Sequence, residues 1–480
     1  MPGALSYPLD ASSTEYRDTE DLFAKEYNER AKRFGTAWKY YDGDMPKPLA
    51  KDKGDSVDDN IILAKIGQIT DKIVSFMFGD GIRFDAGADD NDESTGESQV
   101  QALWTANRQQ ITLHNIALGG ALEGHVFVRL EPRTGQMPKI TMLNPAHCSV
   151  FWSLEDIDRR LWYRLQYRIG DKGTGKRIDY VQGLFNQDKS VILMTPDDPW
   201  WEFVYTTEAG DINWKLQDKP TKLPWSFSPV VDWQNMPRPH AYYGADDVNP
   251  AIKLNLALNL LASMYSRILK HHASPKTIGT GFTAETLIES SIGGFYTVSS
   301  PDAKVYNLEM QSDLNSAREF MKILDSEIWS AVRMLDPQAI RDTVGQLTNF
   351  GLRVLYTDAI RKTDTKRLLY AEGFEEITKR ALAMAGKSIP AKVAVIWPDT
   401  LPSNSAEQIA SDLEELGAGV IDKKTYRERH GYDNDKIEAR LKEEQQDSSQ
   451  NNDVQRARTV ARAMSDFALT GSPPGGNNDG

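Results

Sequence analysis

The sequence contains one cysteine, Cys148, among 480 residues. A single thiol cannot form an internal disulfide, which excludes a disulfide-stabilised scaffold and fits a reducing compartment. Paired cysteines and the HExxH pattern are also absent, so we predict neither a metal site nor a cofactor. Residues 1–21 lack a basic start followed by an apolar core, and no secretory signal is expected.

Long apolar runs are absent too. The best candidate for a membrane span, residues 251–269, is interrupted by polar side chains that include Lys253, Asn255, Asn259, Ser263 and Arg267. A bilayer core disfavours each buried charge by a few kcal/mol. The sequence therefore predicts a soluble chain with no membrane partner.

An excess of basic residues is missing as well. The chain carries 56 Lys and Arg against 69 Asp and Glu, a formal net charge of −13. Proteins that grip nucleic acid neutralise many phosphates, so this balance argues against tight binding and leaves open a surface along which DNA slides. At 480 residues the chain exceeds what one core usually serves, and two or three domains are expected.

The first half of the chain predicts helices followed by antiparallel strands. Helical periodicity covers residues 14–41, 59–78 and 99–124, and an acidic, polar stretch at 85–97 is typical of a solvated loop. From His125 to Asp232 short aromatic and β-branched runs alternate with turn residues, which favours an antiparallel meander with one apolar face. The fold class is therefore α+β.

The second half predicts a rod. Residues 246–272 and 314–335 carry apolar side chains at three- and four-residue spacing, and a β-rich segment, 274–308, separates them. Their similar lengths suggest antiparallel partners. Because a lone two-helix rod exposes much apolar area, we expect neighbours from other copies in a closed ring. The alternative is a helical hairpin buried inside one subunit.

A polar loop and a basic helix at 348–383 follow the rod. We expect the basic side chains of that helix to form ion pairs with neighbouring acids. These basic residues are Arg353, Arg361, Lys362, Lys366 and Arg367. A strand within 391–402 comes next, and then polar helices, the first opened by the capping box of Ser405 and Gln408 and closed near Gly417. After residue 446 the composition predicts a disordered tail.

Candidate catalytic groups are few. Residues 170–176 match GxxxxGK, but Arg177 follows where a phosphate-binding loop has Ser or Thr, and the flanks are typical of a hairpin. His147 and Cys148 would point to opposite faces of a strand, so we interpret them as structural. His114 and His125 lack evident partners, and His271 and His272 suit the end of a helix. The rival function is a nucleotide-dependent DNA enzyme that uses residues 170–176.

The chain resembles the portal proteins of tailed bacteriophages and related viruses. In order, the segments that carry the resemblance are YYDGDMPKPL, DDNIILAKIGQITDKIVSFMFGDGIRF, GGALEGHVFVRLEP with MLNPAHCSVFW, SPVVDWQNMPRPHAYYGADDVNPAIKLNLALNLLASMY, TNFGLRVLYTDAIRKTDTKRLLYAEGFEEI, and AVIWPDTLPSNSAEQIASDLEELGAGVIDKKTYRERHGY. Together they reach from near the start to about residue 444. No single segment is diagnostic, and the weight of the resemblance lies in their order.

The resemblance implies a ring without catalysis, usually a dodecamer, at one capsid vertex. Double-stranded DNA would be packaged and later ejected through its channel. The implied parts are a wing (1–245), a first stem helix (246–273), a clip (274–310), a second stem helix (311–335), a tunnel loop (336–349), a long helix with a wing strand (350–402), a crown (403–446) and the tail (447–480).

Implied site residues and partners follow from these parts. The implied partners are the terminase large subunit, a head–tail adaptor, and the major capsid and scaffolding proteins, in the virion and in the host cytoplasm during assembly. A head–tail connector of another type is the remaining alternative. The residues expected to contact DNA are Pro337, Gln338, Arg341, Asp342, Thr343, Gly345, Gln346, Thr348 and Asn349. Those expected to dock the motor or adaptor are Glu285, Glu289, Asp302 and Lys304.

Overall fold

The computed structural model describes residues 6–7, 14–50, 58–79, 81–86, 93–152, 156, 158–169, 173–185, 191–192, 197–210, 213–273, 277–280, 302, 304–307, 314–337, 349–390, 392–400, 405–429, 434, 437, 440–441, 459–460 and 462. They divide into two compact units, residues 1–401 and 402–480. Helices and strands are mixed throughout the first unit, as the α+β prediction requires. None of the helices in the described ranges is long and apolar enough to span a bilayer.

Four helices open the first unit: α1 (Thr14–Tyr41), α2 (Lys65–Phe78), α3 (Glu93–Ala106) and α4 (Gln109–Glu123). Helix α1 has the predicted bounds. The helix predicted from residue 59 begins only at Lys65, because residues 58–64 bond their backbone to side chains of another helix. Part of the stretch predicted as loop, 93–97, is the first turn of α3.

The helix predicted at 99–124 is broken in two. Arg108 adopts a left-handed φ of 52° between α3 and α4. The side chain of Asn107 stabilises this turn, since it donates to the Pro138 carbonyl (3.0 Å) and accepts from the Ile140 amide (2.8 Å). A side chain that bonds to a distant backbone segment here replaces the next helical turn.

Two antiparallel sheets replace the single predicted meander. The smaller sheet has the order β13-β3-β4, with β3 at His125–Glu131, β4 at Lys139–Leu143 and β13 at Val230–Gln234. The larger sheet has the order β11-β10-β7-β6-β5. Its strands are β5 (Cys148–Trp152), β6 (Arg160–Arg168), β7 (Gly175–Gln182), β10 (Trp200–Thr207) and β11 (Lys215–Leu216), and β12 (Thr221–Lys222) also pairs with β10.

The prediction of one apolar face was wrong for the larger sheet. Tyr163 and Leu165 of β6 lie in one buried cluster, whereas Trp162 of the same strand joins Val181 and Phe203 in another. Adjacent residues of a strand point to opposite faces, so both faces are buried. The minor strands are β1 (Ser6–Tyr7), β8 (Leu184–Phe185) and β9 (Val191–Ile192), which form a small sheet, and the pair β2 (Arg83–Asp85) and β16 (Ala394–Ile396).

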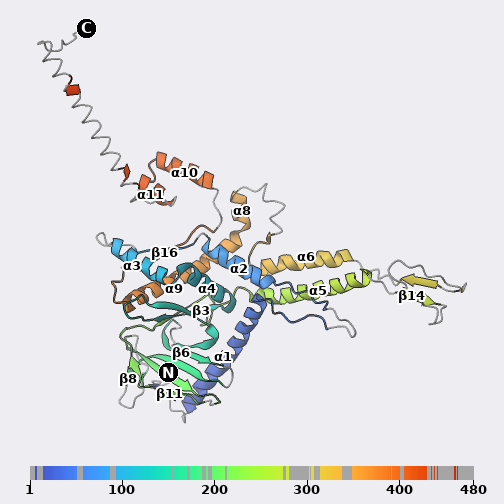
Figure 1. The fold of residues 1–480 in the computed structure, drawn as a ribbon, viewed down its shortest axis with the longest axis horizontal. Helices are drawn as coiled ribbons and strands as arrows, with labels where there is room; N and C mark the ends of the chain where they lie inside the picture. The colour runs from blue at the N-terminus through green and yellow to red at the C-terminus, as the bar shows by residue number, and fades with distance from the viewer. Residues whose placement is uncertain are drawn as a thin grey trace, which may run out of the picture. The chain divides into compact units, whose positions relative to one another are not determined.

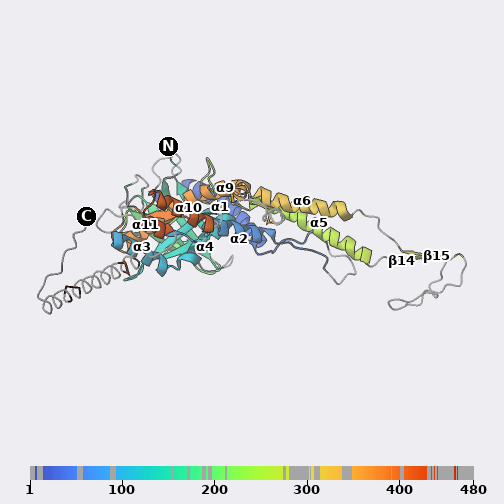
Figure 2. The same ribbon diagram turned by 90° about the horizontal axis from the view of Figure 1, so that it is seen from above.

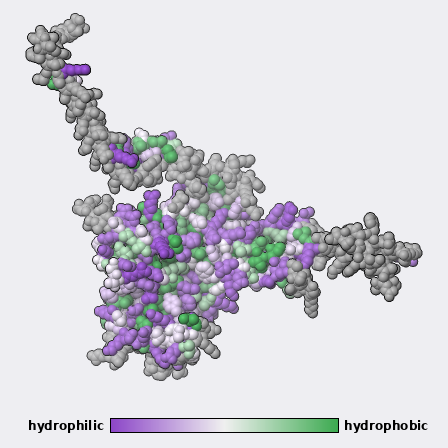
Figure 3. Space-filling view, in the orientation of Figure 1, coloured by the Kyte–Doolittle hydropathy of each residue, from purple (hydrophilic) through white to green (hydrophobic). Residues whose placement is uncertain are grey.

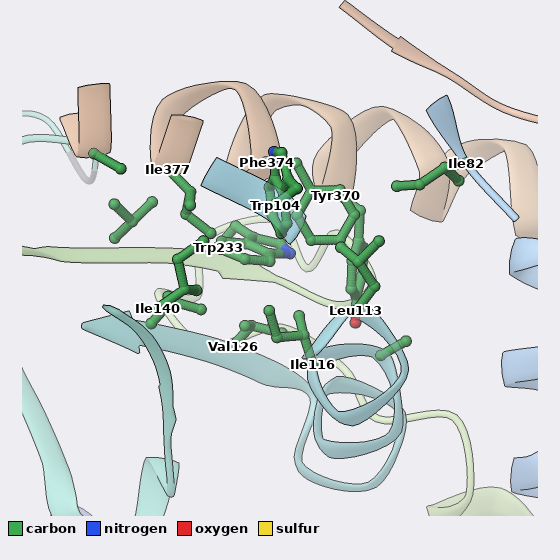
Figure 4. Packing of buried hydrophobic residues seen from close by; sticks show 14 of the residues in the cluster. Ile82, Trp104, Leu113, Ile116, Val126, Ile140, Trp233, Tyr370, Phe374 and Ile377 are labelled. Atoms are coloured by element: carbon green, nitrogen blue, oxygen red, sulfur yellow. The ribbon is translucent and has the colours of Figure 1, made fainter. Parts of the chain in front are cut away.

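The main core lies between the smaller sheet and three helices, α3, α4 and α9 (Thr357–Met384). Figure 4 shows Tyr370 and Phe374 of α9 packed with Trp104 and Trp233, above Val126 of the sheet. The predicted helix 348–383 is split at Tyr356 into α8 (Asn349–Leu355) and α9. The Tyr356 ring stacks on Phe76, with centroids 5.7 Å apart.

Helices α5 (Asn249–Ala273) and α6 (Leu314–Ala331) lie side by side and extend away from the sheets (Figure 1, Figure 2). We call this pair the hairpin. The helices are 25 and 18 residues long, so their lengths are less similar than predicted. The chain turns at Arg333, whose φ is 59°. Strands β14 (Thr277–Thr280) and β15 (Lys304–Asn307) pair antiparallel.

The second unit contains α10 (Ser405–Gly417) and α11 (Lys423–Arg429), which pack together. Helix α10 begins and ends at the predicted residues. A carboxylate oxygen of Asp422 accepts from the Thr425 amide (2.8 Å) and so satisfies a free donor in the first turn of α11. The predicted tail disorder concerns residues that lie almost wholly outside the described ranges.

Candidate oligomerisation surface

A buried carboxylate fixes the hairpin to the rest of the first unit, which we call the body. Asp246, at the start of α5, accepts from the Asn249 amide (2.7 Å), as a helix N-terminus favours. Asp247 points inward and pairs with Lys362 (2.7 Å) and Lys366 (2.6 Å) of α9. Burial alone would raise the pKa of Asp247, but the two ammonium groups hold the pKa below its usual range.

The expectation of ion pairs along the basic helix is therefore confirmed for Lys362 and Lys366, and also for Arg353. Arg353 lies 3.8 Å from Asp399 at the surface. The guanidinium of Arg367 instead donates to the Met77 carbonyl (2.7 Å), and Arg361 is exposed. Of the five basic residues, Lys362 and Lys366 thus pair with one buried carboxylate, that of Asp247.

One side of α5 binds an extended segment, residues 58–64, which we call the strap. The Ile61 amide donates to the Ser263 hydroxyl (2.9 Å) and the Leu63 amide to the Asn259 side chain (3.0 Å). The Asn255 amide group donates to the Leu63 carbonyl (2.9 Å). The three side chains are spaced by four residues and share one buried face of the helix.

The side of α5 away from the strap is apolar and incompletely buried. Positions at three- and four-residue spacing on this side carry Ala257, Leu260, Leu261, Met264 and Ile268, and each of them is half-buried or exposed. Met264 is 44% exposed. We call this surface the α5 flank.

Helix α6 carries a second apolar surface. Met321, Leu324 and Ile328 pack toward the cluster shared with α5 and α2. Phe320 and Ile323 lie outside it and are 50% and 56% exposed; we call these two side chains the α6 flank. Figure 3 shows apolar residues gathered over the hairpin. A hairpin buried inside its own subunit would not leave these side chains in water.

Most of the residues expected to contact DNA or to dock partners lie outside the described ranges. Pro337, beyond the end of α6, is exposed, and Asn349 begins α8. Asp302 and Lys304 are exposed, and Lys304 pairs in register with Thr280. The residues that the structure does not describe are Glu285, Glu289, Gln338, Arg341, Asp342, Thr343, Gly345, Gln346 and Thr348.

The rival nucleotide site lacks the required geometry. Strand β6 pairs antiparallel with β7, Arg168 opposite Gly175, so a strand follows the glycine-rich turn. A phosphate-binding loop needs a helix there, with its free N–H groups directed at the phosphates. Cys148 is buried and burial raises the pKa of its thiol, which disfavours the nucleophilic thiolate.

A buried network surrounds Asp232, and no local pattern in the sequence predicts it. Its carboxylate accepts hydrogen bonds from His125 Nε2 (2.9 Å), the Tyr163 hydroxyl (2.6 Å) and the Tyr242 hydroxyl, and Arg160 lies at 3.3 Å. The interpretation of His125 as a residue without partners was wrong, because its partner is 107 positions away.

The Asp232 network lines a cavity of about 690 Å³ beside α9. Three hydrogen-bond donors and the Arg160 guanidinium surround the carboxylate, which leaves it little capacity to bind a metal ion. Within the described ranges no group of three or more His, Cys, Asp or Glu is arranged to hold one. We interpret the network as a tie between β13, β3 and β6 within the body.

Comparison with known proteins identifies the class of protein. A family model described as "Phage portal protein, SPP1 Gp6-like" matches residues 21–451. The chain therefore belongs to the phage portal protein family, which confirms the resemblance carried by the sequence segments. No match was found among curated proteins.

Proposed function

We propose that the chain assembles into a ring at one capsid vertex, through whose channel double-stranded DNA is packaged and later ejected. The proposal is supported by the family, whose members serve as portals, and by the hairpin. The single observation that carries it is the exposed apolar surface of the α5 and α6 flanks, which a lone subunit leaves in water.

The two flanks differ, and this difference favours a ring. The α6 flank offers the protruding side chains of Phe320 and Ile323, whereas the α5 flank is a row of aliphatic side chains around Met264. A contact between two different surfaces, repeated with a constant rotation, closes into a ring when a whole number of copies completes one full turn. In the proposed ring the α6 flank of each copy packs against the α5 flank of the next.

The parts of the chain then take the following roles in the proposed ring. The segment 336–349 connects the base of the hairpin to α8 and serves as the tunnel loop, with Arg341 as its one basic residue. The clip, 274–310, docks the terminase motor and later the head–tail adaptor, and 403–446 forms the crown. Body helices and sheets form the wing, which contacts capsid and scaffolding proteins.

The charge of the chain suits passage of DNA rather than capture. Each copy carries a formal charge of −13, and duplex DNA carries one negative charge per about 1.7 Å of axis. Repulsion acts over a Debye length of about 8 Å at physiological salt, so a channel wall of such subunits keeps DNA from binding tightly. We propose no catalytic step for this chain; a separate motor supplies the energy.

Mass photometry of the full chain with electron-microscopic top views tests the proposal. We expect a particle near a whole-number multiple of 53.9 kDa, with twelve copies as the expected number, and a central opening that admits a duplex. A stable monomer or dimer over the micromolar range would overturn the proposal. A closed ring without an opening would leave the assembly but refute the channel.

A further inference from the structure

The base of the hairpin is held by one side chain that reaches both of its helices. The ammonium group of Lys362 lies 2.7 Å from an Asp247 carboxylate oxygen, just before α5, and donates to the Val332 carbonyl (2.8 Å), just after α6. Lys362 is 8% exposed and Asp247 is 3% exposed. Lys362 thus contacts the base of α5 through an ion pair and the base of α6 through a hydrogen bond.

The neighbouring ties reach one helix each. Lys366 bonds to Asp247 on the α5 side, where Asn235 also donates to the carboxylate (3.1 Å). On the α6 side, Lys65 of α2 lies 2.8 Å from Asp325. Loss of any of these leaves the link through Lys362 between the two bases and α9 in place.

Ring closure sets a demanding tolerance on the angle of the hairpin. Twelve copies require a rotation of about 30° per copy and thirteen require about 28°, a difference of about 2°. With 25 residues, α5 is about 37 Å long, so a tilt of about 2° about its base moves its far end by about 1.3 Å. A displacement of this size is enough to lengthen a hydrogen bond beyond its normal range of distances.

We propose that Lys362 is the positioning residue that fixes the angle of the hairpin to the body, and through that angle the number of copies that close one ring. The inference rests on the proposed ring. Because Lys362 belongs to α9, which follows α8 in the chain, the same side chain links the angle of the hairpin to this helix.

Native mass spectrometry of assembled rings tests the inference. Lys362→Met removes both bonds at similar side-chain length, and we expect its rings to spread over at least one more copy number than wild type. Lys366→Met is the matched control: it removes a more deeply buried ammonium from the same carboxylate but leaves the link to Val332, and its rings should have the wild-type distribution. Lys362→Gln can still donate to the Val332 carbonyl, so it should restore part of the uniformity.

A second measurement reports the angle without assembly. In a chain kept monomeric by Phe320→Lys and Ile323→Lys, spin labels on cysteines placed at the exposed positions Lys322 and His114 give a distance distribution between hairpin and body. The native Cys148 is buried and does not compete for label. We expect Lys362→Met to widen this distribution and Lys366→Met to leave it unchanged.

The outcomes separate the two proposals. If wild type forms no ring, the proposed function fails. If wild type forms rings and Lys362→Met rings keep the same copy number, only the positioning role fails. An equal broadening in Lys366→Met would also overturn it, because the effect would then be a general loosening of the junction. If Lys362→Met does not fold, Lys362→Gln decides by both readouts, and an unfolded Lys362→Gln would refute positioning in favour of a purely structural role.

Discussion

The α6 flank offers the sharpest test of how copies contact one another. We consider the double substitution Phe320→Lys and Ile323→Lys. Neither side chain belongs to the buried clusters, so the fold of a single copy loses little. A lysine at 323 follows Glu319 by four residues and precedes Glu327 by four, and such pairs stabilise a helix by about 0.2–0.5 kcal/mol each. The variant should therefore fold.

The expected loss of affinity follows from the exposed fractions. Full burial of an Ile or Phe side chain contributes about 1.5–3 kcal/mol. Since 50% of Phe320 and 56% of Ile323 remain exposed, covering the rest is worth about 1–1.5 kcal/mol each, or about 2–3 kcal/mol per contact. At 1.4 kcal/mol per factor of ten this is a loss of roughly 30- to 140-fold at each contact, before the cost of desolvating two ammonium groups.

Mass photometry across a concentration series measures this effect, with circular dichroism to confirm folding. Because every copy makes two such contacts, we expect the variant to remain monomeric at concentrations where wild type is fully assembled. Ile111→Lys is the matched control, since Ile111 of α4 is 58% exposed and lies off the hairpin. Wild-type rings in the double variant would refute the assignment of the α6 flank. Equal loss of rings in the control would show that charge alone, and not its place, prevents assembly.

Three further predictions concern the body and are measured by urea unfolding in the monomeric background. Burial raises the pKa of Glu123 to about 7. A carboxyl group whose pKa is raised in the folded state contributes its full stability below the pKa of the unfolded state, and this stability is lost as the pH rises through 7. Glu123→Gln should therefore be more stable than its parent by up to about 3 kcal/mol at pH 8, with little difference at pH 4. Asp247→Asn should cost about 3–5 kcal/mol at pH 7 because two buried ammonium groups lose their counter-charge. Burial lowers the pKa of Lys366, so the deficit should shrink as the pH becomes alkaline; a deficit independent of pH would contradict this cause. Gly373→Ala should destabilise by about 1–3 kcal/mol despite the better helix propensity of alanine, because an added Cβ would lie 2.5 Å from the Trp233 ring, and a stabilised variant would show that the ring has room to move.

Helix type and the larger elements were predictable because apolar periodicity is a local signal. Helix α1 has the predicted bounds, and the hairpin helices were found within a few residues of their observed ends. The errors have a common cause, which is competition from distant groups. Asn107 turns the chain by bonding to another segment, and Asp232 binds His125 across 107 positions. No local pattern encodes such pairs.

The exposed apolar surface of the hairpin was predictable from the sequence, but the separate faces of α5 were not. The expectation that the rod exposes apolar side chains is confirmed by Phe320 and Ile323. The polar residues of α5 served only as an argument against a membrane span, although Asn255, Asn259 and Ser263 recur every four residues. This spacing was the available signal for a helix that binds an extended segment along one face.

The strap explains why the apolar surface of α5 lies where it does. A helix of a hairpin has one face for its partner helix and would otherwise expose the remainder. In α5 the strap covers a second face through buried Asn255, Asn259 and Ser263, so its backbone is satisfied by side chains that an apolar helix would lack. The face around Met264 is left, and the apolar residues of the α5 flank on it lie outside the buried clusters of the described residues. Because the polar side chains bind the strap and another face packs on α6, neither of these two faces of α5 can turn toward a neighbouring copy. In the proposed ring, the same three residues that retain the strap would therefore restrict contact between copies to a single side of α5.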